Sequence, residues 1–200
     1  MLISRLLVCF GVLFVLAGCG AKSEWATDQE VAQAYFKADG PSTLTLFTVI
    51  NNRSKSGAHS GLLINGSQRV MFDPAGTWYH PDLPERNDVH FGMTDAAVDF
   101  YVDYHARVTF HVVIQEVVVP PAVAEKALQL ALANGPVSKA RCSVSISTLL
   151  RQLPGFESIR QTWYPKKLME SFATLPGVKT ETVFDNDPDD NTGFILAPRL

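Results

Sequence analysis

The chain has 200 residues, of which 46% are hydrophobic and 18% are charged, and its net charge is −3. This length suits one domain of ordinary size with its own hydrophobic core. The slightly acidic balance argues against a nucleic-acid-binding protein, so no nucleic-acid partner is expected.

Residues 1–18 have the layout of a secretory signal peptide. One positive charge, at Arg5, precedes an almost wholly apolar run from Leu6 to Leu16. This run is too short for a comfortable membrane span, which needs roughly 20 apolar residues. It ends in Leu-Ala-Gly-Cys, which resembles the lipobox of bacterial lipoproteins, in which the cysteine is acylated and becomes the first mature residue. The resemblance implies a lipid anchor, with fatty acids such as palmitate, on Cys19; an ordinary signal peptide or an uncleaved anchor is the alternative.

Gly20 follows this cysteine, where an aspartate would favour the inner membrane of a Gram-negative cell. By the same resemblance, the expected location in such a cell is the outer membrane, with the protein facing the periplasm. Removing residues 1–18 leaves 182 residues and takes away one arginine, so the net charge becomes −4. We expect an anchor linker at 19–26, one domain over 27–184 and an acidic irregular tail at 185–200.

The three cysteines have different expected fates. Cys9 lies in the signal peptide and Cys19 is acylated, so Cys142 has no partner for an internal disulfide. Because an exported protein can form disulfides, its unpaired cysteine needs an explanation.

The order of predicted elements indicates an α+β fold without repeats. Thr27 and Glu30 form a capping box that begins a helix ending near Gly40. The next predicted elements are strands at 44–50, 59–64 and 69–73, an irregular loop at 74–93, and a helix that begins at Thr94-Asp95, with Val98, Tyr101, Val102 and His105 on one face. The last are a strand at 107–119 and helices at 122–133, 142–153 and 165–173.

Cys142 lies at the N-terminus of a predicted helix, after Lys139 and Arg141. The free amide groups and the positive end of the helix dipole stabilise a thiolate, which is the nucleophilic form of cysteine. The spacing to Ile146 and Leu149 places the thiol on the apolar face of this helix. Cys142 is therefore either a nucleophile at a buried helix end or a core residue, a common role for a free cysteine.

A cysteine nucleophile needs a base, and the sequence has five histidines. His80 and His90 fall in the predicted loop, while His105 and His111 lie within a helix and a strand, where a core or surface role is the simpler interpretation. His59 begins an apolar strand directly after a polar loop, so it lies at the rim of a sheet and can face a cleft. We expect His59 to be the base.

The strand after His59 offers a group that could hold the imidazole in position. If the turn is Asn65–Ser67, then Leu62 pairs with Val70 and His59 lies directly opposite Asp73, on the same face of the sheet. A two-residue turn at Asn65-Gly66 would put Asp73 on the wrong face. Asp73 can also serve only to initiate a turn before its proline.

Three segments carry a resemblance to a known family: His-Ser-Gly-Leu-Leu-Ile at His59, Val-Met-Phe-Asp-Pro-Ala-Gly at 70–76, and Cys-Ser-Val-Ser-Ile-Ser-Thr-Leu-Leu at Cys142. They resemble the circularly permuted NlpC-type papain-like cysteine hydrolases, a group that includes relatives of lecithin:retinol acyltransferase. In this group the histidine strand precedes the cysteine helix, and a proline-led helix follows, as at Pro165. The resemblance covers about residues 59–175 and departs at Arg141, where many relatives have asparagine.

The resemblance implies a papain-like α+β domain, in which an antiparallel sheet packs against the cysteine-bearing helix. Cys142 would be the nucleophile, His59 the base and Asp73 the polar third residue, while the first helix amides would bind the oxyanion. The implied activity is that of a lipid-anchored hydrolase or acyltransferase acting on an amide, such as a cell-wall peptide, or on an ester. Candidate substrates are peptides, acylated amines and lipids. The competing interpretation is a catalytically inactive envelope lipoprotein that acts as a binding module.

Metal sites have weaker support in the sequence. Asp185, Asp187 and Asp189 imitate the start of a calcium loop, but Asp190 and Leu196 stand where that loop needs glycine and glutamate. No two histidines have helical ligand spacing, and there is no Cys-x-x-Cys pair. We expect no metal and no cofactor.

Overall fold

The computed structural model describes residue 21 and residues 23–191. The expected signal peptide with Cys9, the expected lipidation site Cys19, and residues 192–200 of the expected tail lie outside the described residues. Within the part of the chain that is described, no helix combines the length and the apolar character needed to cross a membrane.

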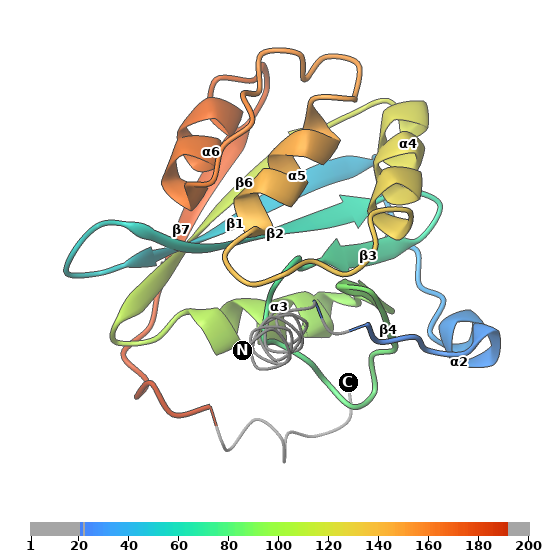
Figure 1. Ribbon diagram of the computed structural model, residues 1–200, viewed down its shortest axis with the longest axis horizontal. Helices are drawn as coiled ribbons and strands as arrows, with labels where there is room; N and C mark the ends of the chain where they lie inside the picture. The colour runs from blue at the N-terminus through green and yellow to red at the C-terminus, as the bar shows by residue number, and fades with distance from the viewer. Residues whose placement is uncertain (1–20, 22, 192–200) are drawn as a thin grey trace, which may run out of the picture.

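Seven strands form one sheet, and helices lie on both of its faces (Figure 1). The elements are, in chain order, α2 Asp28–Gln33, β1 Thr43–Asn51, β2 Gly57–Asn65, β3 Arg69–Phe72, β4 Glu85–Arg86, β5 Val89–Phe91, α3 Asp95–His105, β6 Phe110–Val118, α4 Pro121–Leu132, α5 Cys142–Leu150, α6 Pro165–Phe172 and β7 Lys179–Phe184. The strand order across the sheet is β4-β5-β3-β2-β1-β6-β7, and every neighbouring pair is antiparallel. The predicted α+β class is therefore confirmed.

The sheet separates two hydrophobic cores. Helices α4, α5 and α6 cover one face, and α3 lies on the other (Figure 1). Leu44 and Leu62 point into the larger core with α4–α6, whereas Phe47 and Leu63 point into the core with α3. Since the central strands are buried on both faces, each large apolar side chain contributes about 1.5–3 kcal/mol to folding on one face or the other.

Helix α2 is shorter than predicted, although its capping box is present. The Glu30 amide donates to Thr27 Oγ1 at 3.2 Å, and the Thr27 amide donates to Glu30 Oε2 at 2.7 Å. The helix ends at Gln33 because the chain then packs on Arg69. The carbonyl of Phe36 accepts the Arg69 amide at 2.8 Å, and the Arg69 guanidinium lies 5.0 Å from the centre of the Phe36 ring.

The prediction of an irregular loop at 74–93 is wrong in its second half. A short hairpin of β4 and β5 lies there, and β5 joins the sheet beside β3. Its turn residues, Asn87 and Asp88, have φ angles of 46° and 66°. Positive φ at both central residues is typical of the type I′ hairpin turn, and asparagine and aspartate tolerate it well.

One strand begins later than predicted, and another strand was not predicted. The strand expected at 107–119 begins at Phe110, because Arg107 and Phe110 close a tight turn with two backbone hydrogen bonds of 2.9 Å. Strand β7 has no counterpart among the predicted elements. Its side chains are almost all exposed, so it lacks the apolar alternation that indicates a half-buried strand.

The β2–β3 hairpin has a different register from the predicted one. Asn65 pairs with Arg69, so the loop is Gly66–Gln68 and not Asn65–Ser67. Asn65 stays in the strand because it also pairs with Thr43 of β1, and its side chain donates to the carbonyl of Pro41.

The new register moves each residue of β2 by two positions along β3. Leu62 lies opposite Phe72, and the prediction that His59 lies directly opposite Asp73 is wrong. By continuation of the pairing, Asp73 is level with Gly61, diagonal to His59. Because the shift is an even number of residues, both side chains stay on the predicted common face.

Candidate active site

Three segments that are far apart in the sequence meet at one edge of β2. Strand β3 ends at Phe72, so beyond this point no described strand pairs with that edge. Asp73 follows β3 directly, and α5, whose first residue is Cys142, packs against β2. The hydroxyl oxygens of Ser60 and Ser143 lie 3.2 Å apart across this contact.

One oxygen of Asp73 accepts two hydrogen bonds. His59 Nε2 donates to Asp73 Oδ1 at 2.6 Å, and Tyr101 Oη donates to the same oxygen at 2.7 Å. Asp73 is buried, with 1% of its surface exposed. Because Nε2 donates to this carboxylate, the tautomer and the orientation of the ring are fixed. Nδ1 is then the nitrogen that can exchange a proton with the thiol.

Two glycines make room for this carboxylate. A Cβ atom on Gly61 would lie 2.3 Å from Tyr101 Oη and 3.2 Å from Asp73 Oδ1. A Cβ atom on Gly76 would lie 1.7 Å from Asp73 Oδ2. Both positions therefore need the absence of a side chain, and neither carries the left-handed φ that usually explains a glycine.

Cys142 is the first residue of α5 and is 6% exposed. Its thiol is hydrogen-bonded to the His59 ring and accepts the backbone N–H of Ser60. The Ser143 hydroxyl oxygen lies 3.8 Å from the sulfur. The sulfur thus lies among hydrogen-bond donors at the start of a helix, which is a different environment from that of a cysteine enclosed only by aliphatic side chains.

These contacts favour an ion pair of thiolate and imidazolium. For His59, burial alone would lower the pKa, but the charge and hydrogen bond of Asp73, together with Cys142, raise it to about 10. For Cys142, burial alone would raise the pKa, but the hydrogen bond and charge of His59, the Ser60 amide and the Ser143 hydroxyl lower it overall. The pair titrates as a unit, and both shifts favour its charged state.

The groups around Asp73 keep it ionised, so that its negative charge acts on His59. Burial would raise the pKa of Asp73, yet the charge and hydrogen bond of His59 lower it well below the usual range. Burial and the nearby carboxylate raise the pKa of Tyr101, so its hydroxyl remains a donor. Burial lowers the pKa of His90 and of His105 to about 4, so both are neutral at pH 7.

His105 forms one wall of the site. Its ring stacks on His59 with the ring centres 5.7 Å apart and the planes 10° apart. Its Nδ1 lies 2.8 Å from the Tyr101 carbonyl, which can only accept, so Nδ1 carries the hydrogen. His105 therefore restrains the His59 ring without competing for the Asp73 carboxylate.

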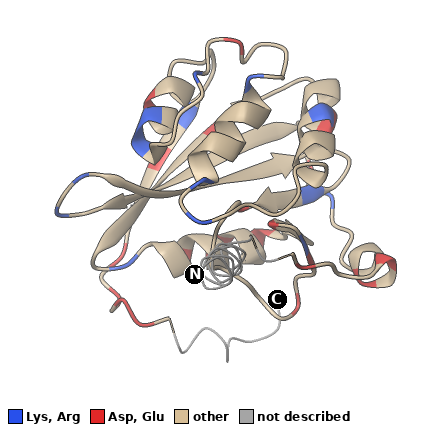
Figure 2. Ribbon diagram, in the orientation of Figure 1, with Lys and Arg blue, Asp and Glu red and all other residues tan. Residues whose placement is uncertain are grey.

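The structure separates the basic residues before the nucleophile from the thiol. Arg141 is the N-cap residue of α5 and has no side-chain capping bond; its guanidinium lies 5.1 Å from the centre of the exposed Trp163 ring. Lys139 is exposed in the preceding loop. Figure 2 shows basic residues at the start of α5 and on α6, which places positive charge at the rim of this face.

Two aspartates of the acidic segment after β7 lie close to an aspartate of α3. Side-chain oxygens of Asp103, Asp185 and Asp187 lie within 4.8 Å of one another. Asp189, the third member of the imitated motif, accepts a hydrogen bond from the Thr109 amide instead. Arg107 pairs with Asp103 at 3.3 Å and with Asp187 at 3.8 Å, so a protein cation already neutralises part of this charge.

Sequence reasoning selected Cys142, His59 and Asp73, and the structure brings these three together. Sequence reasoning missed Tyr101 as a partner of Asp73 and His105 as a partner of His59. The only signal for them is the apolar face that they share on α3, which predicts burial but does not reveal which strand they meet. The glycine in His-Ser-Gly, opposite the aspartate, is the one local sign that a side chain must approach there.

Comparisons with known proteins do not add to this picture. No protein-family model matches the sequence, and neither the curated proteins nor the solved structures contain a match.

Proposed function

We propose that the protein is a papain-like thiol hydrolase or acyltransferase of the circularly permuted NlpC type, anchored by lipid on Cys19 to the bacterial outer membrane and facing the periplasm. The order of the site residues, with the histidine strand before the cysteine helix, supports the permuted arrangement. The sheet packed against a cysteine-bearing helix supports the papain-like architecture. The scissile bond is an amide, as in a peptide or isopeptide of the cell wall, or an ester.

The reaction begins with the Cys142 thiolate and the His59 imidazolium. The thiolate attacks the substrate carbonyl, a C–S bond forms, and the carbonyl oxygen takes the negative charge. The first amides of α5, which have no intrahelical acceptor, stabilise this oxyanion. Collapse of the intermediate breaks the bond to the leaving group, which takes the proton from His59.

The second half of the reaction regenerates the enzyme. Neutral His59 removes a proton from water, or from an amine or alcohol acceptor, and this nucleophile attacks the thioester. The C–S bond breaks, Cys142 leaves as a thiolate, and His59 is again the imidazolium. Asp73, held by Tyr101, stabilises each imidazolium state and keeps the ring in position.

One observation carries the proposal: the Cys142 thiol and the Asp73 carboxylate engage the two sides of the same imidazole, with 2.6 Å between His59 Nε2 and Asp73 Oδ1. A thiol, base and orienting carboxylate in hydrogen-bonding sequence are the minimum set for nucleophilic catalysis by cysteine. A binding module has no requirement for this alignment.

The test is to trap the acyl-enzyme. Purified protein is mixed with p-nitrophenyl esters and with N-acyl p-nitroanilides, quenched in acid, and analysed by peptide mass spectrometry. We expect an acyl adduct on Cys142 and a burst of nitrophenol. Cys142→Ser and His59→Ala should each lower the rate on the order of 10³-fold or more. Unchanged turnover in both variants, or no acyl adduct on Cys142 with any of these esters or amides, would overturn the proposal in favour of a binding module.

The proposed anchor has a separate test. The mature protein from bacterial membranes should begin at Cys19 and carry the mass of its acyl chains, whereas Cys19→Ser should remain unprocessed and lack that mass. An intact mass without fatty acid would refute the anchor and leave the catalytic proposal standing.

A further inference from the structure

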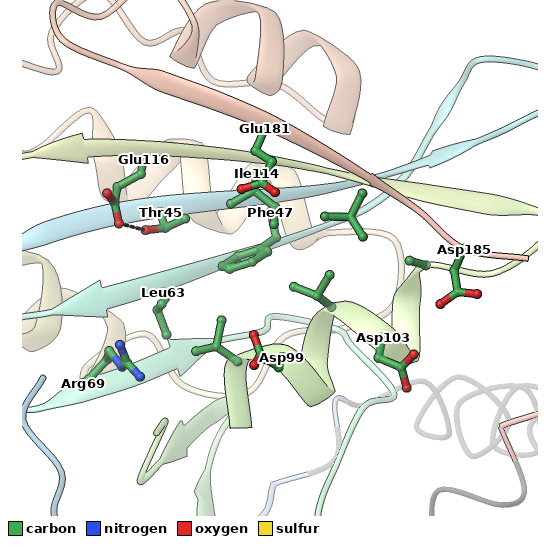
Figure 3. A pocket seen from close by; sticks show the side chains of 14 residues that line it. Thr45, Phe47, Leu63, Arg69, Asp99, Asp103, Ile114, Glu116, Glu181 and Asp185 are labelled. Atoms are coloured by element: carbon green, nitrogen blue, oxygen red, sulfur yellow. Dashed lines mark hydrogen bonds between the residues drawn. The ribbon is translucent and has the colours of Figure 1, made fainter. Parts of the chain in front are cut away.

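A cavity of about 450 Å³ lies on the sheet face that carries α3. Figure 3 shows residues that line it, and α5 lies on the opposite face of the sheet (Figure 1). Residues of β1, β2, β3, β6, β7 and α3 line the cavity, and none of Cys142, His59 and Asp73 is among them. We call it the α3 groove. Its volume lies within the range of small-molecule sites, which is about 300–1,000 Å³.

The floor of the α3 groove is apolar. Phe47 of β1 and Ile114 of β6 lie at its base (Figure 3), and Val183 of β7 and Val102 of α3 also line it. Ile114, Val102 and Val183 are only partly buried, although they pack against the core beneath α3. A ligand with an apolar body would remove this remaining surface from water, which is favourable.

The rim is acidic. Asp99 and Asp103 come from α3, Glu116 and Glu181 come from the opposing strands, and Asp185 directly follows β7. Within the described chain, no lysine or arginine forms an ion pair with Asp99, Glu116, Glu181 or Asp185. Figure 2 shows acidic residues on α3 and on the segment after β7.

Among the residues that the structure describes, Arg69 is the only basic one that lines the groove, and it has partners elsewhere. Its Nη2 lies 2.6 Å from Asp95, its Nε donates to the Met93 carbonyl, and its guanidinium lies over the Phe36 ring. It lies at the opposite end of the groove from Asp103 and Asp185 (Figure 3). At the end formed by the C-terminal part of α3, Arg107 offsets part of the negative charge by pairing with Asp103, while the other rim carboxylates keep theirs.

We propose that the α3 groove binds a small cationic amphiphile: a primary amine or guanidine on an apolar chain or ring. The apolar body would lie on Phe47 and Ile114, and the cationic head would lie between Asp99 and Asp185, away from Arg69. An anionic ligand would meet like charge along most of the rim. A neutral apolar ligand would gain only from the floor and would leave the rim without a counter-charge.

The test measures the affinity of three ligands that share one apolar chain. Decylamine, decanol and decanoate, each below its micellar concentration, are titrated into the purified chain by calorimetry. We expect decylamine to bind at least about tenfold more tightly than decanol, and decanoate to bind most weakly. Because the carboxylates are exposed to salt, this preference should shrink as ionic strength rises above about 0.15 M. Equal affinity for all three ligands would overturn the proposal.

Substitutions of residues that line the groove test whether the ligand binds there. Asp99→Asn and Glu181→Gln should each weaken decylamine binding about two- to fivefold and leave decanol binding unchanged, as expected for partly exposed ion pairs. Glu170→Gln on α6, on the other face of the sheet, is the matched control and should have no effect. Ile114→Trp fills the floor and should reduce binding of both ligands at least about tenfold. Equal effects of Glu181→Gln and Glu170→Gln would overturn the proposal.

A second copy of the chain could cover the groove instead. Sedimentation velocity distinguishes the two: a dimer that Asp99→Asn dissociates, together with no decylamine binding, would replace the proposed ligand by a protein interface. The proposal is independent of catalysis, so Cys142→Ser should bind decylamine as the wild type does.

Discussion

Gly61→Ala perturbs the contact that holds Asp73 in place. The added Cβ would lie 2.3 Å from Tyr101 Oη, so either the tyrosine or strand β2 must move. Tyr101 of α3 is fully buried in the core between this helix and the sheet, and its side chain cannot move out without opening a cavity. We expect Gly61→Ala to destabilise the protein by about 1–3 kcal/mol, as overpacking in a core does.

Removing the tyrosine hydroxyl should relieve this clash. Tyr101→Phe alone loses a hydrogen bond to a charged carboxylate, at a cost of about 1.5–3 kcal/mol. In the Tyr101→Phe background, the nearest remaining atoms to the new Cβ are ring carbon Cζ at 3.1 Å and Asp73 Oδ1 at 3.2 Å, which shifts of a few tenths of an ångström can accommodate. The double variant should therefore lie within about 1 kcal/mol of Tyr101→Phe, well short of the sum of the two single effects.

The assay is urea unfolding of the four proteins in this double-mutant cycle, followed by fluorescence and extrapolated to water. Gly66→Ala, in the loop of the same hairpin, is the matched control, since its Cβ would have no neighbour nearer than 3.5 Å. Its cost should stay within about 0.5 kcal/mol. If Gly61→Ala costs the same with tyrosine and with phenylalanine at position 101, the proposed contact does not exist.

Three further predictions concern the site and its support. The rate of acyl transfer should rise with pH as Cys142 ionises, with a pKa below that of an ordinary cysteine thiol, and fall as His59 loses its proton near pH 10. A profile without a fall at high pH would contradict the ion pair. Asp73→Asn removes the charge that raises the His59 pKa, so the fall of the rate at high pH should move to lower pH, and kcat/KM should drop on the order of 10²-fold. If the fall at high pH does not move, Asp73 is not what raises the His59 pKa. Gly57→Ala brings a Cβ within 2.6 Å of the Lys166 amide nitrogen at the start of α6, and it should lower the free energy of unfolding by about 1–3 kcal/mol, whereas an effect as small as that of Gly66→Ala would refute the close approach.

Alternation and turn chemistry could predict the faces of the sheet but not the pairing within it. In the predicted and in the observed register, the residue opposite Asp73 is an even number of positions from His59, so the two side chains share a face in both. The prediction of a common face is therefore correct although the predicted loop is wrong. Asn65 suits a turn and a strand equally well by its sequence. Its pairing with Thr43 of β1, a long-range contact, decides the matter.

The missed elements lacked the signals that sequence reasoning uses. Strand β7 lies at the sheet edge with most side chains exposed, so no apolar periodicity marks it. The β4–β5 hairpin has strands of only two and three residues, and its Asn87-Asp88 turn was its one usable sign. Tyr101 could be predicted as buried, but its bond to Asp73 depends on the packing of α3 against β2 and β3, which no local pattern encodes.

The central claim is that His59 holds Cys142 as a thiolate. The direct measurement is the rate at which iodoacetamide alkylates Cys142, followed from pH 4 to 10 by mass spectrometry of the peptide that contains it, in the wild type and in His59→Ala. We predict that the wild-type rate reaches half its maximum well below pH 9, and that His59→Ala moves this midpoint upward, since burial then raises the pKa without opposition from the imidazolium. Identical midpoints in the two proteins would contradict the claim.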